Sequence, residues 1–152
     1  MGNVVVSQFV TVDGVVEDPG GAESFERGGW AFQFERGHEG DKFNTMPKFV
    51  VSTTLENPEW NNTTVISGDV AGEVSRLRDQ FAGDVLVNGS AQLVNALAQD
   101  DLVDEWRLMV FPVVLGKGKR LFADGLDRKP LEVVETKPAG EVVILTLRPK
   151  AE

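Results

Sequence analysis

The residues between positions 84 and 94 have the types and the order that could bind a phosphate group. Residues 85–87 (Val-Leu-Val) form an apolar run between turn residues, which predicts an interior strand. Gly89 allows a sharp turn with no side chain in the way of a ligand, and Ser90 is a preferred N-cap. A helix that begins directly after a strand presents unpaired N–H groups and the positive end of its dipole. The segment therefore predicts a phosphate cradle, with an ordinary strand-to-helix turn as the alternative.

A second candidate for anion binding is the basic run from Gly116 to Arg120 (Gly-Lys-Gly-Lys-Arg). It gathers three of the 15 Lys and Arg residues into five positions between two apolar stretches. Such a loop can bring positive charge to an anionic ligand, but a solvated surface loop has the same composition. The sequence leaves both interpretations open.

Other kinds of site have little support. No stretch has the G-x-G-x-x-G fingerprint of dinucleotide-binding folds or the Gly-Lys-Ser/Thr ending of a P-loop. His38 is the only histidine and the chain has no cysteine, so a serine–histidine–aspartate triad or a zinc site has few residues to use. We interpret Asp100, Asp101, Asp104 and Glu105 as a solvated corner rather than an acid/base pair. No residue is assigned as catalytic, and no metal is expected.

Strands that alternate with helices must position these residues. Apolar and β-branched runs predict strands at residues 4–10, 48–52, 64–66, 84–88, 105–110, 131–136 and 142–148. Apolar residues at helical spacing predict one helix that follows Asp69 and another that runs from Ser90 to about Gln99. Residues 137–140 are typical of a hairpin connection. The pattern predicts an α/β fold with a mixed sheet, mostly parallel, that ends in a C-terminal antiparallel hairpin.

Composition favours a single domain over residues 1–152 with a small-molecule partner. The net charge of −9 argues against a nucleic-acid or anionic-membrane surface, since both partners need a clustered positive field. No apolar run approaches the roughly 20 residues of a membrane span. The N-terminus has no pattern of a secretory signal, and the absence of cysteine excludes disulfides. We therefore expect a cytoplasmic protein.

Four motifs occur in an order that resembles a known family. They are residues 7–16 (SQFVTVDGVV), 47–55 (PKFVVSTTL), 87–93 (VNGSAQL), and 102–105 (LVDE) with 111–122 (FPVVLGKGKRLF). Together they resemble the dihydrofolate-reductase-like superfamily, in the branch named for the reductase domain of the riboflavin-biosynthesis deaminase/reductase. The resemblance implies a mixed sheet with helices on both faces. It also implies NADPH-dependent hydride transfer to a small heterocycle, such as a pterin or a pyrimidine, usually by a homodimer.

The resemblance further implies where each part of the cofactor and the substrate lies, with the dinucleotide over the carboxyl ends of the strands. Val12, Asp13 and Gly14 would lie beside the nicotinamide, and Ser52, Thr53 and Thr54 would bind the adenosine 2′-phosphate. The pyrophosphate would bind at Gly89, Ser90, Ala91, Gln92 and Leu93. The loop from Phe111 to Gly118, with Phe111, Val113, Leu115 and Gly116, would border the substrate or the dimer interface. None of these residues is a covalent catalyst, because the hydride chemistry belongs to the cofactor.

The chain departs from the family pattern between residues 38 and 46. Members of the family carry a strand that ends in Gly-Arg-x-Thr-Tyr-Glu and then a helix, whereas this sequence passes from His38 to Pro47 without them and has no tyrosine. Either the sequence omits residues of the protein or the protein is a deletion variant, and we favour omission. In the family that strand and helix form a second phosphate cradle, and its absence would favour an alternative function, a non-catalytic nucleotide- or flavin-binding protein on the same fold. A purely structural dimerisation module is a third possibility.

Overall fold

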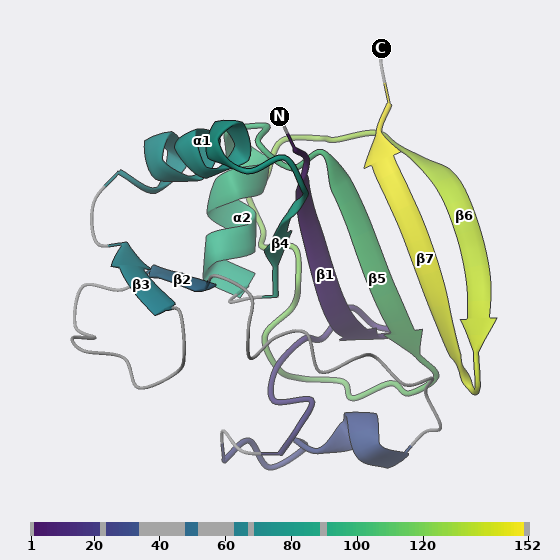
Figure 1. Ribbon diagram of the computed structural model, residues 1–152. Coiled ribbons are helices and arrows are strands. Elements are labelled where there is room, and N and C mark those ends of the chain that lie inside the picture. Colours follow the sequence, from purple (N-terminus) through teal and green to yellow (C-terminus); the bar gives the residue numbers. More distant parts are fainter. Residues whose placement is uncertain are drawn as a thin grey trace.

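A computed structural model describes residues 2–21, 24–33, 48–51, 63–66, 69–88 and 91–150. Its main element is a five-stranded sheet in the order β4-β1-β5-β7-β6 (Figure 1). These strands are β1 (Val4–Thr11), β4 (Val85–Val87), β5 (Glu105–Phe111), β6 (Leu131–Ala139) and β7 (Val142–Pro149). A separate parallel pair consists of β2 (Lys48–Val51) and β3 (Thr63–Ile66). Every predicted strand is therefore present, with its ends shifted by a few residues.

The five-stranded sheet is mixed, as the sequence predicts. Strand β1 is parallel to β4 on one side and to β5 on the other. Strand β7 is antiparallel to β5, and β6 is antiparallel to β7. Because β1, β4 and β5 run in the same direction, their carboxyl ends lie at one edge of the sheet and their amino ends at the other. The two edges carry different kinds of contact.

The C-terminal hairpin is confirmed, but its turn is shorter than the sequence predicts. Strand β6 continues through Pro138, which pairs with Val143, and ends at Ala139, which pairs with Val142. The connection is thereby reduced to Gly140 and Glu141, and the φ of Gly140 is +62°, in the region that favours glycine. Proline is tolerated at this position because β6 is an edge strand, where a missing N–H need not break the ladder.

The two predicted helices are also present. Helix α1 (Val70–Gln80) begins after Asp69, whose side chain accepts a hydrogen bond of 3.2 Å from the N–H of Gly72. Helix α2 (Ala91–Gln99) follows β4, as expected, and buries Val94 and Leu97. Among the described residues, no helix is long and apolar enough to cross a membrane.

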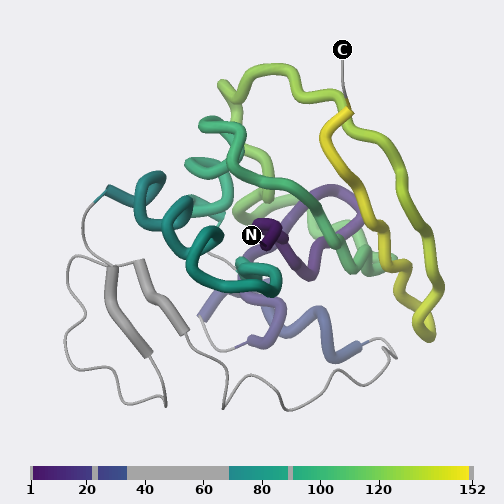
Figure 2. Tube along the Cα trace, turned by 45° about the horizontal axis from the view of Figure 1, so that its top comes forward, coloured from purple at the N-terminus to yellow at the C-terminus, as the bar shows by residue number. Residues whose placement is uncertain are grey.

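Alternation along the strands divides the core between the two faces of the sheet. Val4, Val6 and Val10 of β1 face a cluster to which α1 and α2 contribute buried side chains. The opposite face carries a smaller cluster built around Phe111 and Trp30, the first residue of the 3₁₀ helix η1 (Trp30–Gln33). In Figure 2, α1 and α2 lie together on one side of the sheet, and η1 lies away from them. In the described part of the chain, both α-helices therefore cover one face, and η1 covers the other.

Residues before η1 are held by several hydrogen bonds and by a buried tryptophan. Asp18 is 2% exposed, and its backbone carbonyl accepts hydrogen bonds from the N–H groups of Gly21 and Gly29. The indole Nε1 of Trp30 donates to the carbonyl of Glu17 at 2.9 Å. The Trp30 ring meets the Phe111 ring edge-on, with centroids 5.2 Å apart. The buried Trp30 thus joins Glu17 to Phe111 on this face of the sheet.

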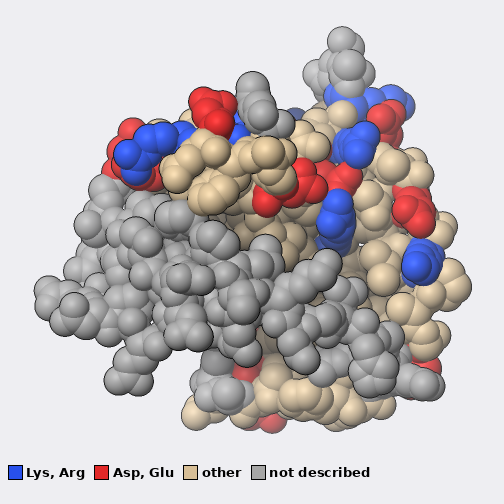
Figure 3. Space-filling model, viewed as in Figure 1, with Lys and Arg blue, Asp and Glu red and all other residues tan. Residues whose placement is uncertain are grey.

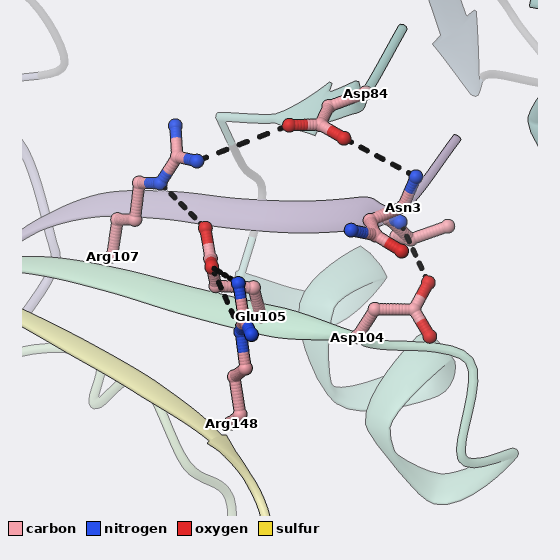
Figure 4. Close-up of polar contacts among 7 residues, drawn as sticks. Asn3, Asp84, Asp104, Glu105, Arg107 and Arg148 are labelled. Atoms are coloured by element: carbon pink, nitrogen blue, oxygen red, sulfur yellow. Dashed lines mark hydrogen bonds and ion pairs between the residues drawn. The ribbon is translucent and has the colours of Figure 1, made fainter. Parts of the chain in front are cut away.

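At the amino-terminal edge of the sheet, Glu105 is buried rather than solvated as the sequence analysis expected. Glu105 is 4% exposed and accepts hydrogen bonds from Arg107 at 2.6 Å and from Arg148 at 3.1 and 3.2 Å (Figure 4). Asp104 accepts from the N–H of Val4 at 2.8 Å. The sequence interpretation is correct for Asp100 and Asp101, which are exposed, and wrong for Glu105, because a run of acidic residues does not reveal that arginines from β5 and β7 meet it in the sheet.

The predicted missing segment near residues 38–46 lies outside the described residues, so the choice between omission and deletion stays a prediction. An intact trans chain there would keep consecutive Cα atoms about 3.8 Å apart.

Candidate functional site

Loops from three parts of the chain meet at the carboxyl edge of β1 and β5. They are residues 11–17 after β1, residues 24–29 before η1, and residues 112–121 after β5. Figure 1 shows these loops below the ends of the two strands. Backbone hydrogen bonds join the first loop to the third, from Val12 N–H to the Val113 carbonyl at 3.2 Å and from Val16 N–H to the Lys119 carbonyl at 2.8 Å. In open α/β sheets, ligands bind at this edge.

The loop after β1 is a tight turn closed by Thr11. The Thr11 N–H donates to the Val15 carbonyl at 3.0 Å, and the Thr11 hydroxyl accepts from the Val15 N–H at 2.9 Å. Gly14 has a φ of +86°, which a residue with a side chain adopts only with strain. Val12, at the tip of the turn, is 61% exposed. The turn therefore presents one apolar side chain on a rigid backbone.

Asp13 fastens this turn to the loop after β5. Its carboxylate accepts from the N–H of Gly116 at 2.9 Å, from the N–H of Leu115 at 3.3 Å and from the Thr11 hydroxyl at 2.5 Å. The Thr11 hydroxyl, followed by the Gly116 and Leu115 amides, lowers the pKa of Asp13 from 3.8 to about 2, although burial acts in the other direction. The carboxylate thus binds the protein's own backbone, and its role is to position the loops.

The basic run also bonds largely to the protein itself. Lys117 forms an ion pair with Glu26, and the Arg120 guanidinium donates to the backbone carbonyl of Asp13. The Lys119 N–H donates to the Glu17 carboxylate at 2.9 Å. These contacts favour the interpretation as a loop that closes on its neighbours over that of a loop reserved for an anion. Elsewhere on the molecule, Figure 3 shows basic and acidic side chains next to one another over the upper part of the face in view.

Glycine at position 118 is required by two independent features. Its φ is +120°, and a Cβ atom there would lie 2.8 Å from Cγ1 of Val15 and 3.1 Å from the Phe25 ring. Arg27 reaches the same loop and donates to the Leu115 carbonyl. The three loops are consequently packed against one another as one unit.

The predicted site residues divide into those that the structure brings together and those that it does not describe. Val12, Asp13 and Gly14 lie beside Val113, Leu115 and Gly116, as the hydrogen bonds show. Phe111 is wholly buried between Phe9 and Trp30, so it supports the loop from beneath. Ala91, Gln92 and Leu93 form the first turn of α2. Ser52, Thr53, Thr54, Gly89 and Ser90 lie outside the described residues, and their roles stay predictions.

Sequence reasoning missed one polar residue in the sheet itself. Gln8 is 9% exposed, and its side-chain Nε2 has no hydrogen-bond partner among the described residues. The signal was present in the sequence, because Gln8 interrupts the apolar series Val4, Val6 and Val10 on one face of a strand. The described residues contain no group of three or more His, Cys, Asp and Glu side chains that could hold a metal ion.

Comparison with known proteins identifies the class. Residues 27–145 match the family model of the RibD C-terminal domain, and the chain belongs to that family. The sheet and its helices have the dihydrofolate-reductase-like α/β fold of the RibD-like structures that it resembles.

Individual proteins and solved structures are also similar to this chain. The chain is 36% identical over 101 residues to the uncharacterized protein YyaP of Bacillus subtilis (strain 168), covering 66% of this chain and 53% of that protein. The chain spans about half the length of the curated relatives it matches. A Shewanella sp. PV-4 protein assigned provisionally to riboflavin biosynthesis matches 98% of this chain and 99% of its own, with a TM-score of 0.72 and 18% identity. The Thermotoga maritima diaminohydroxyphosphoribosylaminopyrimidine deaminase/5-amino-6-(5-phosphoribosylamino)uracil reductase matches 98% of this chain and 57% of its own, with a TM-score of 0.62 and 15% identity.

Proposed function

We propose that this protein is an NADPH-dependent reductase that transfers a hydride to a small heterocycle of the pyrimidine type. The observation that carries the proposal is the match of residues 27–145 to the RibD C-terminal domain family. A fold relative from Thermotoga maritima is named as a uracil reductase, which supports the substrate class. The packed loops at the carboxyl edge of β1 and β5 supply the expected place for a ligand.

The described residues fit a dinucleotide. An exposed apolar side chain, Val12, stands on a tight turn where a nicotinamide ring could pack, and Gln8 holds a buried donor that bonds to none of the described residues. NADPH, when bound, supplies the hydride. The chain's own residues would bind and orient the cofactor. Asp13 fixes the turn that carries Val12 against the loop after β5. Trp30 packs on Phe111, which lies beneath both loops.

A second candidate, a non-catalytic nucleotide- or flavin-binding protein, has one observation in its favour. In the described parts of the three loops, the carboxylates of Asp13, Glu17 and Glu26 are already bonded to loop N–H groups or to Lys117. None of these three is therefore poised to give a proton to a reduced substrate. A reductase on this site would take the proton that completes the reduction from water.

Two measurements on one preparation separate the candidates. Calorimetric titration with NADPH and with NADH should show saturable binding of NADPH. Steady oxidation of NADPH should then follow when pyrimidine substrates are added. Binding without turnover across pterins and pyrimidines would favour the second candidate, and no binding of either dinucleotide would leave only a structural role.

We also propose that the protein acts as a homodimer. The apolar side chains of Val133, Val134 and Val143 on the β6–β7 hairpin are 62%, 47% and 45% exposed. Strand β6 is an edge strand, and a second copy of the chain would cover its unpaired side.

A further inference from the structure

Gln8 occupies a position where the rest of β1 places apolar side chains. Val4, Val6 and Val10 lie on the same face and belong to the cluster that α1 and α2 cover. In the sheet, Gln8 of β1 is paired with Leu108 of the neighbouring strand β5, and Leu108 is also buried. Burial of an amide among aliphatic residues is unfavourable unless its polar atoms are bonded.

The amide nitrogen of Gln8 does not meet that condition. Its Nε2 is buried, and no residue in the part of the chain that the structure describes forms a hydrogen bond with it. Leaving a buried donor unsatisfied costs about 1–3 kcal/mol, so such groups are few in native proteins and call for an explanation. A ligand that brings an acceptor oxygen would remove this cost.

The position of Gln8 along β1 shows which ligand can reach it. Val6 pairs with Val87, the last residue of β4, so Gln8 lies beyond the carboxyl end of that strand. The chain then passes from β4 into α2, which begins at Ala91 on the face of the sheet toward which Gln8 points. The start of a helix favours negative charge, so α2 presents a positive end on the face of the sheet that also carries the buried Gln8 amide.

We propose that the Gln8 side-chain amide donates a hydrogen bond to a diphosphate oxygen of the bound dinucleotide. This inference rests on the proposed function and assigns Gln8 as a binding residue beside the start of α2. The amide supplies a donor without a charge, which suits a position within the apolar core. A carboxylate at this position would repel the diphosphate. An aliphatic residue would leave the diphosphate oxygen without a hydrogen-bond donor.

The test is the variant Gln8→Met, which keeps the length of the side chain and removes the amide. We expect the free variant to melt at the same temperature as the parent or higher, because an unsatisfied buried donor has been removed. We expect its dissociation constants for NADPH and for ADP to rise about tenfold, as loss of one hydrogen bond to a charged acceptor predicts. Gln8→Leu replaces Gln8→Met if the latter fails to fold. Ser7→Ala, the neighbouring residue on the opposite face of β1, is the matched control and should bind both ligands like the parent.

Three results would overturn the assignment. The first is a Gln8→Met protein that binds NADPH with the affinity of the parent. The second is a melting temperature several degrees lower at unchanged affinity, which would make Gln8 a structural residue. The third is weaker binding of NADPH but not of ADP, which would place the acceptor outside the diphosphate. A parent protein that binds neither NADPH nor ADP would instead overturn the proposed function itself.

Discussion

The two edges of the central sheet use their polar residues in different ways. At the amino edge, Glu105 is buried between two arginines, and all three side chains stand on strands (Figure 4). At the carboxyl edge, Asp13 stands on a turn and bonds mainly to the N–H groups of another loop. Glu105 thus binds only side chains that stand on strands, whereas two of the three hydrogen bonds that Asp13 accepts come from the backbone of another loop.

We infer from this difference that the polar residues at the amino edge contribute to stability and those at the carboxyl edge to ligand binding. The ion pair between Glu105 and Arg148 joins β5 to β7, and Arg107 binds the same carboxylate from within β5. Bonds from a side chain to loop backbone fix the shape of a surface at the edge where ligands bind. Changes at the amino edge should therefore alter stability alone, and changes at the carboxyl edge should alter binding.

The largest effect is expected from Gly89→Val at the carboxyl edge. The sequence predicts that the backbone at Gly89 approaches the pyrophosphate, and a branched side chain would exclude it. Loss of two charge-assisted N–H contacts, at about 1.5–3 kcal/mol each, would weaken NADPH binding at least about 100-fold. The dissociation constant and the melting temperature should be measured on the same sample. A folded variant that binds NADPH like the parent would remove this residue from the site.

At the amino edge, Glu105→Gln should lower the free energy of unfolding by about 2 kcal/mol, because two arginines lose a charged partner. The arginines are half exposed and can be solvated, which keeps the loss below that of a fully buried pair. Urea unfolding measures the change, and NADPH affinity should not move. A loss of affinity at unchanged stability would contradict the separation of the two edges.

The hairpin provides a third region with which to test the comparison. If two copies meet at β6, Val133→Glu should raise the dissociation constant of the dimer about tenfold, as burial of one unpaired charge at an interface predicts. Sedimentation equilibrium of parent and variant would measure this. Lys137→Arg, which keeps the charge of the same strand, is the control. A parent that is wholly monomeric at micromolar concentration would exclude the homodimer.

The smallest effect is expected from Asp13→Asn. The pKa of Asp13 is lowered to about 2, so its bonds stabilise the folded state above about pH 4, and that stability is lost as the pH falls toward 2. The variant should lose about 1 kcal/mol at neutral pH and show a flatter acid limb in its unfolding curve. Urea midpoints from pH 7 to pH 2 would test this. An acid limb equal to that of the parent would show that Asp13 titrates alike in both states.

Local patterns allowed much of this protein to be predicted. The apolar runs of β1, β4 and β5 and the helical spacing after Asp69 depend on neighbours in the sequence, and these elements are present. The mixed sheet followed from the alternation of strands and helices and from the hairpin at the end. Motif order was sufficient to identify the RibD C-terminal domain family.

Long-range contacts were decided only by the tertiary structure. Asp13 is 102 and 103 residues from the amides of Leu115 and Gly116 that it binds, and Glu105 is 43 residues from Arg148. No local pattern shows whether a carboxylate will meet solvent, an arginine or a backbone N–H, because that depends on which strands become neighbours. Gln8 lies between the two cases. The sequence alone marks it as a polar residue in an apolar series, but only the packed sheet leaves its amide nitrogen buried without a partner among the described residues.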